Sequence, residues 1–277
     1  MAIKIALVGA AGNMGTRAYN ALHVDSDYEL FCIESPAGVE KMRERGVDCV
    51  LLEEAVQGAD VALMTVPDIL VGKVSTLVVP HLRPGAMLIV LDPAAPYAGE
   101  LPVRDDVSYF ATHPAHPPVF NDEVDMAARR DFFGSGLAKQ SIVNALIQGP
   151  EEDYAKGEAI GSRMFQPILR SHRVTLEQMA MLEPAMSETM AATCITVMRE
   201  AMDEAISRGV PAEAARDFMM GHINIELAIV FDEIDWEFSD GAKLAVEKAK
   251  ETVFQADWKK VFDRENLLAS VKDIVKG

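Results

Sequence analysis

Continuous apolar runs alternate with helix-like segments through the first half of the chain. The runs occupy residues 3–8, 28–33, 47–52, 60–66, 86–91 and 107–112. Apolar runs without a polar alternation are typical of strands that are covered on both faces. The pattern therefore predicts an α/β fold with a Rossmann-type, doubly wound parallel sheet. Ligands of such sheets bind beyond the carboxyl ends of the strands, where we expect one crevice formed by Gly9, Glu34, Asp68, Asp92 and His113.

The second half changes to the 3.6-residue periodicity of helices. Thr175-Leu-Glu-Gln178 fits a capping box that opens a helix, and Gly209 is a plausible helix end. Further helices are expected at 212–220, 222–231, 241–254 and 264–276. The pattern predicts two domains, a sheet domain at 1–150 and an all-α domain at 151–277. The later domain is too flat to bury its apolar stripes alone, so we expect a homodimer that shares it.

A glycine-spaced turn connects the first strand to a helix that begins near Asn13. Its residues of interest are Gly9, Gly12, Asn13, Met14 and Gly15. Glycines let backbone N–H groups and the helix N-terminus approach a pyrophosphate closely. Glu34 ends the second strand, 34 − 15 = 19 residues past the last glycine, where an acidic group accepts hydrogen bonds from ribose hydroxyls and repels a 2′-phosphate. The turn predicts binding of NAD in preference to NADP; the alternative is a structural turn with an incidental glutamate.

Composition narrows the class of protein. A hydrophobic fraction of 49% and a charged fraction of 25% are ordinary for a globular protein. The net charge of −17 argues against nonspecific binding to nucleic acid or to anionic membranes, and an anionic substrate needs a locally basic pocket. Three scattered cysteines form no disulfide framework, and no apolar run approaches the roughly 20 residues of a membrane span. With no signal peptide apparent, we expect a cytoplasmic protein.

Two histidines stand in a proline-rich segment after the last strand of the first half. His113 and His116 lie in Thr-His-Pro-Ala-His-Pro-Pro-Val-Phe-Asn (112–121). Prolines fix φ and lower the entropy cost of holding the imidazoles in place. An imidazole at the ligand crevice can act as a general base or a metal ligand. The alternative is a rigid crossover loop whose histidines bond only to the backbone.

Glu183 occupies a position where a helical stripe predicts an apolar residue. The stripe consists of Leu176, Met179, Glu183, Met186 and Met190. A buried carboxylate is costly unless it is protonated, paired or bound to a cation, which favours a catalytic or metal-binding role. Alternatively, Glu183 caps a helix that restarts at Pro184.

Two histidines and one or two carboxylates suit a divalent ion such as Zn, Mg or Mn, although their spacing matches no short metal motif. His222 can reach the same cleft, but a core or cap histidine is the more common role. Lys243 can neutralise a substrate carboxylate, but a solvated helix lysine is the more common role. Cys194 lies in mid-helix among apolar residues, which argues against a semialdehyde dehydrogenase with a nucleophilic cysteine.

Three motifs together resemble the D-apionate oxidoisomerase family, within the wider 6-phosphogluconate-dehydrogenase-like oxidoreductases. They are the glycine turn (9–15), the histidine-proline segment (112–121) and Met-Leu-Glu-Pro-Ala-Met-Ser-Glu-Thr (181–189). The likeness covers nearly the whole chain. The classical 6-phosphogluconate and hydroxyisobutyrate dehydrogenases rely on a lysine in the helix that here spans 184–199, and this chain has none there.

The resemblance implies an NAD-binding domain followed by a helical, dimerising domain. It implies a divalent metal at His113 and Glu183, and NAD contacts from Asn13, Met14, Glu34 and Asp68. The implied reaction oxidises a branched sugar acid and moves a carbon substituent, with His116 as the base that takes the proton. Two alternatives stay open: a plain NAD(P)-dependent hydroxy-acid dehydrogenase without rearrangement, and a non-catalytic NAD sensor.

Overall fold

The computed structural model describes residues 1–276, which form two compact units. The first unit contains Met1–Glu183 and the C-terminal residues from Leu268 onward; the second contains Pro184–Leu267. This division differs from the expected one near residue 150. The reason is that α7 (Asp153–Phe165) and β7 (Ile168–Arg173) contribute to the sheet of the first unit.

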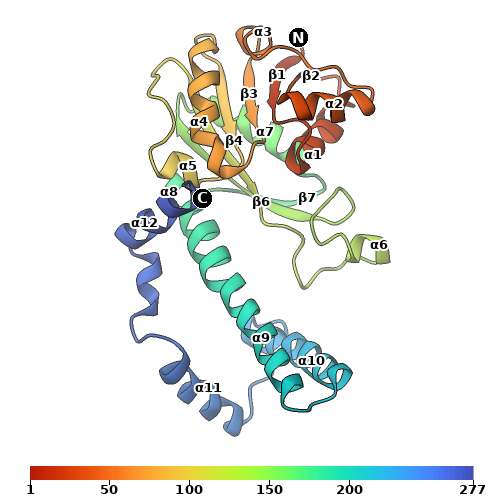
Figure 1. The fold of residues 1–277 in the computed structure, drawn as a ribbon, viewed down its shortest axis with the longest axis vertical. Helices are drawn as coiled ribbons and strands as arrows, with labels where there is room; N and C mark the ends of the chain where they lie inside the picture. Colours follow the sequence, from red (N-terminus) through yellow and green to blue (C-terminus); the bar gives the residue numbers. More distant parts are fainter. Residues whose placement is uncertain (277) are drawn as a thin grey trace. The chain divides into compact units, whose positions relative to one another are not determined.

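A seven-stranded sheet forms the centre of the first unit (Figure 1), in the order β2-β1-β3-β4-β5-β6-β7. Neighbouring strands run parallel, except that β6 is antiparallel to β5. The strands are β1 (Ile3–Val8), β2 (Tyr28–Ile33), β3 (Val61–Met64), β4 (Met87–Val90), β5 (Ser108–Pro114), β6 (Gln140–Gln148) and β7 (Ile168–Arg173). The first five strands form the Rossmann-type, doubly wound arrangement that the apolar runs predict.

Helices connect these strands and build the second unit. Those of the first unit are α1 (Asn13–Leu22), α2 (Pro36–Glu44), α3 (Leu52–Gln57), α4 (Asp68–Val78), α5 (Ala94–Tyr97), α6 (Met126–Arg129), α7 (Asp153–Phe165) and α8 (Leu176–Ala180). A π-helix (Met181–Ala192) follows α8 and crosses the boundary between the units. Then come α9 (Thr193–Ser207), α10 (Ala212–Val230), α11 (Asp240–Val253) and α12 (Arg264–Ile274).

The chain changes direction across the sheet at β1. It passes from β1 to β2 on one side, and then returns to β3 on the other side of β1. Because parallel crossovers are right-handed, α1 and α4 cover opposite faces of the sheet. The reversal falls between β1 and β3, and doubly wound sheets form the crevice that binds their ligands beside the carboxyl ends of such strands.

Two glycines permit close packing at this crevice. Gly9 has φ +91°, a left-handed conformation that a side chain would strain. A Cβ on Gly15 would lie 2.1 Å from the Gly9 carbonyl oxygen, far inside any real contact distance. The first turn of α1 therefore rests directly on the backbone of the loop that follows β1.

Some elements differ from the sequence prediction. Within 47–52, Cys49 makes a single bridge to Cys32, and Leu52 opens α3, so this run is not a strand of the sheet. The apolar runs of the sequence do not predict β6. The expectation of helices alone after residue 150 was wrong at β7. Most side chains of β7 are exposed, because it is an edge strand, so it carries no continuous apolar run. The two helices expected at 212–231 form one helix, α10.

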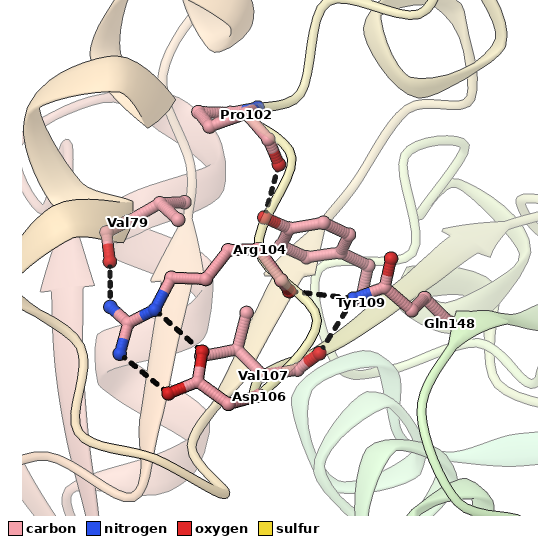
Figure 2. Close-up of polar contacts among 7 residues, drawn as sticks. All are labelled: Val79, Pro102, Arg104, Asp106, Val107, Tyr109 and Gln148. Carbon is pink, nitrogen blue, oxygen red and sulfur yellow. Dashed lines mark hydrogen bonds and ion pairs between the residues drawn. The ribbon is translucent and has the colours of Figure 1, made fainter.

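A cluster of polar contacts stabilises the amino-terminal end of β5 (Figure 2). Arg104 donates to the Val79 carbonyl at 2.5 Å and to Asp106 at 2.8 Å. The Gln148 side chain, at the end of β6, donates to the carbonyls of Arg104 and Val107 at 2.8 and 2.9 Å. These contacts lie at the end of β5 opposite the ligand crevice, so we assign them a structural role.

The second unit leaves large apolar side chains exposed. Within the described chain, α9 and α11 contain no buried residue, and α10 contains one, Ala228. The exposed apolar side chains include Ile195, Phe218, Val230, Phe231, Trp236 and Leu244. Among the described residues, no helix combines the length and the apolar character that a membrane crossing requires.

Candidate active site

Glu34 lies against the glycine turn at the carboxyl end of β1. One of its carboxylate oxygens accepts a hydrogen bond from the backbone N–H of Ala11 at 2.8 Å, and the other accepts from Ser35 at 2.8 Å. The carboxylate thus stands at the end of β2 and beside the turn, as the spacing of 19 residues suggests. The roles of Gly9, Gly12 and the other turn residues in binding a dinucleotide stay predictions.

His113 and Glu183 meet at the carboxyl end of β5. The Nε2 atom of His113 lies 3.1 Å from the Oε2 atom of Glu183, and the two side chains are 18% and 22% exposed. The other ring nitrogen, Nδ1, lies 2.7 Å from the Leu91 carbonyl oxygen. Because a carbonyl only accepts, Nδ1 carries a proton and Nε2 faces the glutamate.

A π-helical turn carries Glu183 to this position. Pro184 lacks a backbone N–H and cannot continue the α-helical ladder of α8, and the backbone widens into the π-helix Met181–Ala192. The Thr189 hydroxyl donates to the Pro184 carbonyl oxygen at 2.7 Å. This π-helix spans 12 residues, and π-helical geometry is rare in proteins and frequently found at functional sites. Glu183 is thus not the cap of a helix that restarts at Pro184, which was the structural alternative.

The contact stabilises the charged forms of both side chains. Burial lowers the pKa of His113, but the hydrogen bond and charge of Glu183, with help from the Leu91 carbonyl and Asp92, raise it further, to about 9. Burial raises the pKa of Glu183, but the bond and charge of His113 and the charge of His116 bring it below its usual value. At neutral pH the two side chains form an ion pair.

Two more carboxyl groups act on this pair. Asp92 follows β4, and its carboxylate accepts a hydrogen bond from Ala94 at 2.6 Å. Burial and the negative charge of Asp68 raise the pKa of Asp92 to about 7. Burial also raises the pKa of Asp68, which opens α4, and the charge of Glu183 adds to that shift. The carboxyl ends of β3, β4 and β5 therefore form a region rich in negative charge.

His116 has an unusual backbone conformation. Its φ is +60°, a left-handed value that costs a non-glycine residue about 1–3 kcal/mol. Its Nδ1 lies 3.1 Å from the Phe133 carbonyl oxygen, and its ring is exposed. With Nδ1–H donating to that carbonyl, Nε2 is left with a free electron pair, as a general base requires.

Other sequence candidates have contacts within the second unit. His222 lies within α10, where it stacks on Phe218 with ring centroids 3.9 Å apart. Lys243 forms an ion pair with Glu237 at 2.5 Å. In contrast, the sequence analysis did not single out Arg17, a buried cation on α1. The sequence feature that could have identified it is an arginine on an otherwise apolar face of a helix.

The chemistry of His113 and Glu183 fits a divalent cation. The bond from Nδ1 to the Leu91 carbonyl orients Nε2, an arrangement common in metal-binding histidines. A cation would also offset the repulsion among Glu183, Asp92 and Asp68. However, no group of three or more His, Cys, Asp or Glu side chains within residues 1–276 is arranged to hold a metal. The remaining ligands would be water or substrate oxygens, as is usual for Mg²⁺.

Comparisons with known proteins identify a matching family model and similar enzymes of known name. The family described as phosphogluconate dehydrogenase (decarboxylating) C-term matches residues 121–275. The D-apionate oxidoisomerase of Cupriavidus necator is 51% identical over 273 residues, which cover 98% of this chain and 99% of that protein. The D-apionate oxidoisomerase of Rhizobium rhizogenes is 49% identical and covers 98% of each chain.

A solved structure is similar over the same length. It is described as a semialdehyde dehydrogenase NAD-binding protein from Cupriavidus necator in complex with calcium and NAD. It is 50% identical, has a TM-score of 0.95, and covers 99% of this chain and 100% of that one. In this chain, burial raises the pKa of the Cys32 thiol to about 12, which disfavours the nucleophilic thiolate at that residue.

We expect the pairing of His113 with Glu183 to be visible in an NMR titration of the protein after dialysis against a chelator. The His113 imidazole should deprotonate near pH 9, and Glu183→Gln should move its pKa downward. Since the folded pKa of His113 is raised and that of Glu183 is lowered, the pair stabilises the fold fully between the unfolded pKa values of about 4.3 and about 6.5. This contribution is lost as the pH rises through about 9, and also as it falls through the lowered pKa of Glu183. Glu200→Gln, on the exposed face of α9, is the matched control. An unchanged His113 titration in Glu183→Gln would contradict the pairing.

Proposed function

This chain belongs to the D-apionate oxidoisomerase family, and we propose that it is an NAD-dependent enzyme that oxidises D-apionate or a closely related branched sugar acid. The reaction joins the oxidation of a hydroxyl group to the migration of a carbon substituent, which gives a rearranged 3-oxo acid. The observation that carries the proposal is the contact of His113 with Glu183 at 3.1 Å, at the ligand-binding edge of the sheet.

The glycine turn and its neighbours bind the dinucleotide. Gly9, Gly12 and Gly15 leave the backbone open to the pyrophosphate, with Asn13 and Met14 in the first turn of α1. Glu34 accepts hydrogen bonds from the ribose hydroxyls and repels a 2′-phosphate, and Asp68 also contacts NAD. NAD bound there accepts the hydride. The complex of the Cupriavidus necator protein with NAD supports this assignment.

His113 and Glu183 hold a divalent cation together with oxygens of the substrate. Such a cation lowers the pKa of a bound hydroxyl group and favours the charge arrangement of a ketol-type rearrangement. The Leu91 carbonyl keeps the Nε2 atom of His113 directed at the site, and Glu183 supplies a full negative charge. Calcium in the similar structure supports a cation in this protein without fixing its identity as Zn, Mg or Mn.

His116 takes the proton of the substrate hydroxyl. The Phe133 carbonyl holds Nδ1–H, so that Nε2 is the basic atom. In its protonated form His116 lowers the pKa of Glu183, which supports a position of this base close to the pair. Its strained backbone is consistent with a ring that is held in place for chemistry.

The second unit forms a homodimer. It leaves apolar side chains exposed on its helices, such as Phe218 on α10, and also in the segment that follows α10, such as Phe231 and Trp236. An accumulation of exposed apolar side chains favours a protein interface, and the phosphogluconate dehydrogenase C-terminal family covers this segment.

The activity is tested by NADH production from D-apionate with and without EDTA, followed by NMR of the product. We expect turnover that EDTA abolishes and a rearranged oxo acid as product. His113→Ala and Glu183→Ala should each lower kcat/KM by at least about 100-fold, since each removes a metal ligand. His172→Ala, on the exposed edge strand β7, should leave turnover unchanged. Chelator-resistant turnover to an unrearranged keto acid would instead identify a plain hydroxy-acid dehydrogenase, and NAD binding without turnover would identify a sensor.

Glu34→Ala should change the choice of dinucleotide. Without the carboxylate, we expect kcat/KM with NAD to fall about tenfold or more, because a charge-assisted hydrogen bond is lost, and the ratio of NADP to NAD activity to rise. Glu29→Ala, an exposed position on the same strand, is the control. If Glu34→Ala kept the preference for NAD of the unaltered enzyme, the role of Glu34 would be excluded.

Light scattering tests the dimer. A subunit mass of 30.2 kDa predicts 2 × 30.2 = 60.4 kDa in solution. Phe231→Glu places a charge on the exposed apolar surface and should shift the mass toward that of the monomer. Lys248→Glu, a polar position on α11, should keep the dimer; a monomeric unaltered protein would refute the assignment.

A further inference from the structure

A pocket on α1 is separate in composition from the residues assigned to NAD, metal and proton transfer. Its volume is about 500 Å³, which is the size of a small-molecule site. It is lined by Asn13, Thr16, Arg17, Asn20, Ala21, Phe133, Ser135, Gly136, Met164 and Gln166, all in the first unit. Of these, only Asn13 is also assigned to NAD. The lining includes no aspartate or glutamate of the described chain.

Arg17 is a buried cation with an unused donor. Arg17 is 9% exposed, and its Nη2 atom has no hydrogen-bond partner within residues 1–276. The guanidinium packs against the rings of Phe133 and Phe165, with its carbon 5.3 and 4.9 Å from their centroids, and Nη1 donates to the Phe133 carbonyl at 3.3 Å. Aromatic faces stabilise the charge but satisfy no N–H of Nη2.

The carboxylate near Arg17 is already engaged. Asp131 accepts hydrogen bonds from the backbone N–H groups of Ser135, Leu137 and Ala138 at 2.6, 3.0 and 3.2 Å. These bonds hold its oxygens on the loop, and its effect on Arg17 is through charge alone. Burial lowers the pKa of Arg17 to about 10, which leaves the side chain protonated at neutral pH. A buried, unpaired positive charge is costly unless an anion joins it.

Three other side chains of the lining present donors. Arginines outside the pocket occupy their acceptor oxygens: Arg45 donates to Thr16 at 2.9 Å and to Asn20 at 3.4 Å, and Arg163 donates to Gln166 at 2.7 Å. Because arginine only donates, the atoms that face it must be oxygens. The hydroxyl hydrogen of Thr16 and the NH₂ groups of Asn20 and Gln166 are therefore the polar hydrogens left for the pocket.

We infer that this pocket binds the oxyanion of a small molecule, a carboxylate or a phosphate group, with Arg17 as its charged anchor. A guanidinium and several neutral donors match the acceptor oxygens of such a group. The protein carries a net charge of −17, so nonspecific attraction of anions is weak and binding at this position needs a built site. This inference does not depend on the proposed function, since it concerns the enzyme without NAD or substrate.

Equilibrium binding of inorganic phosphate and of acetate to the NAD-free enzyme, by NMR at constant ionic strength with chloride as the balancing anion, tests the inference. We expect saturable binding of at least one of the two, and the better ligand identifies the phosphate or the carboxylate as the natural group. Arg17→Met should weaken this binding by about tenfold or more, since a charge-assisted contact is lost. Arg199→Met removes the same charge from an exposed ion pair on α9 and should have no effect.

Gln166→Glu keeps the test decisive if Arg17→Met fails to fold. It retains Arg17 and nearly the same side-chain volume but replaces a donor with a negative oxygen, and it should also weaken binding by about tenfold or more. Binding that survives in both variants, or no saturable binding of either anion, would overturn the inference. Displacement of the anion by saturating NAD would assign it to the glycine turn and would overturn the inference as well.

Discussion

The ion pair of His113 and Glu183 joins the carboxyl end of a buried strand to the last residue of the sheet-containing unit. Each side chain is only partly exposed, so neither charge would be stable there without the other or a cation. Two features of the surrounding structure position these side chains. The Leu91 carbonyl fixes the imidazole, and the π-helix that Pro184 imposes directs the carboxylate toward it. Loss of either support would leave an uncompensated charge at the ligand-binding edge of the sheet.

Much of the fold follows from local sequence patterns. The unbroken apolar strands and the glycine turn specify a doubly wound sheet, and the capping box Thr175–Gln178 forms with both of its hydrogen bonds. The pattern of apolar residues does not predict a strand that is buried on only one face or is exposed on both. The edge strand β7 is nearly all exposed, and its placement comes from pairing with β6, which no local pattern encodes. The boundary between the units is likewise a property of tertiary contacts, because the chain continues helically through residue 184.

The candidate site could be predicted in its members but not in its geometry. A carboxylate on an apolar helical stripe indicated Glu183, and the histidine-proline segment indicated His113. Neither pattern revealed that the two lie 3.1 Å apart or that Asp92 and Asp68 add negative charge beside them. The left-handed backbone of His116 was also beyond the sequence, because it follows from the route of the loop. His222 and Lys243 suggested the same chemistry; within the second unit, His222 stacks on Phe218 and Lys243 forms an ion pair with Glu237.

The distribution of charge limits where this acidic protein can bind an anion. Its excess of 43 acidic over 26 basic residues repels anions in general, so an anion binds only where positive charge is buried and aimed. Two largely buried positions of the first unit carry positive charge: the His113 imidazolium, which Glu183 neutralises, and Arg17, whose Nη2 atom has no hydrogen-bond partner among the described residues. The first is neutralised by the chain itself and the second is not. That contrast makes Arg17, and not His113, the position in this Rossmann-type unit that favours an anionic ligand.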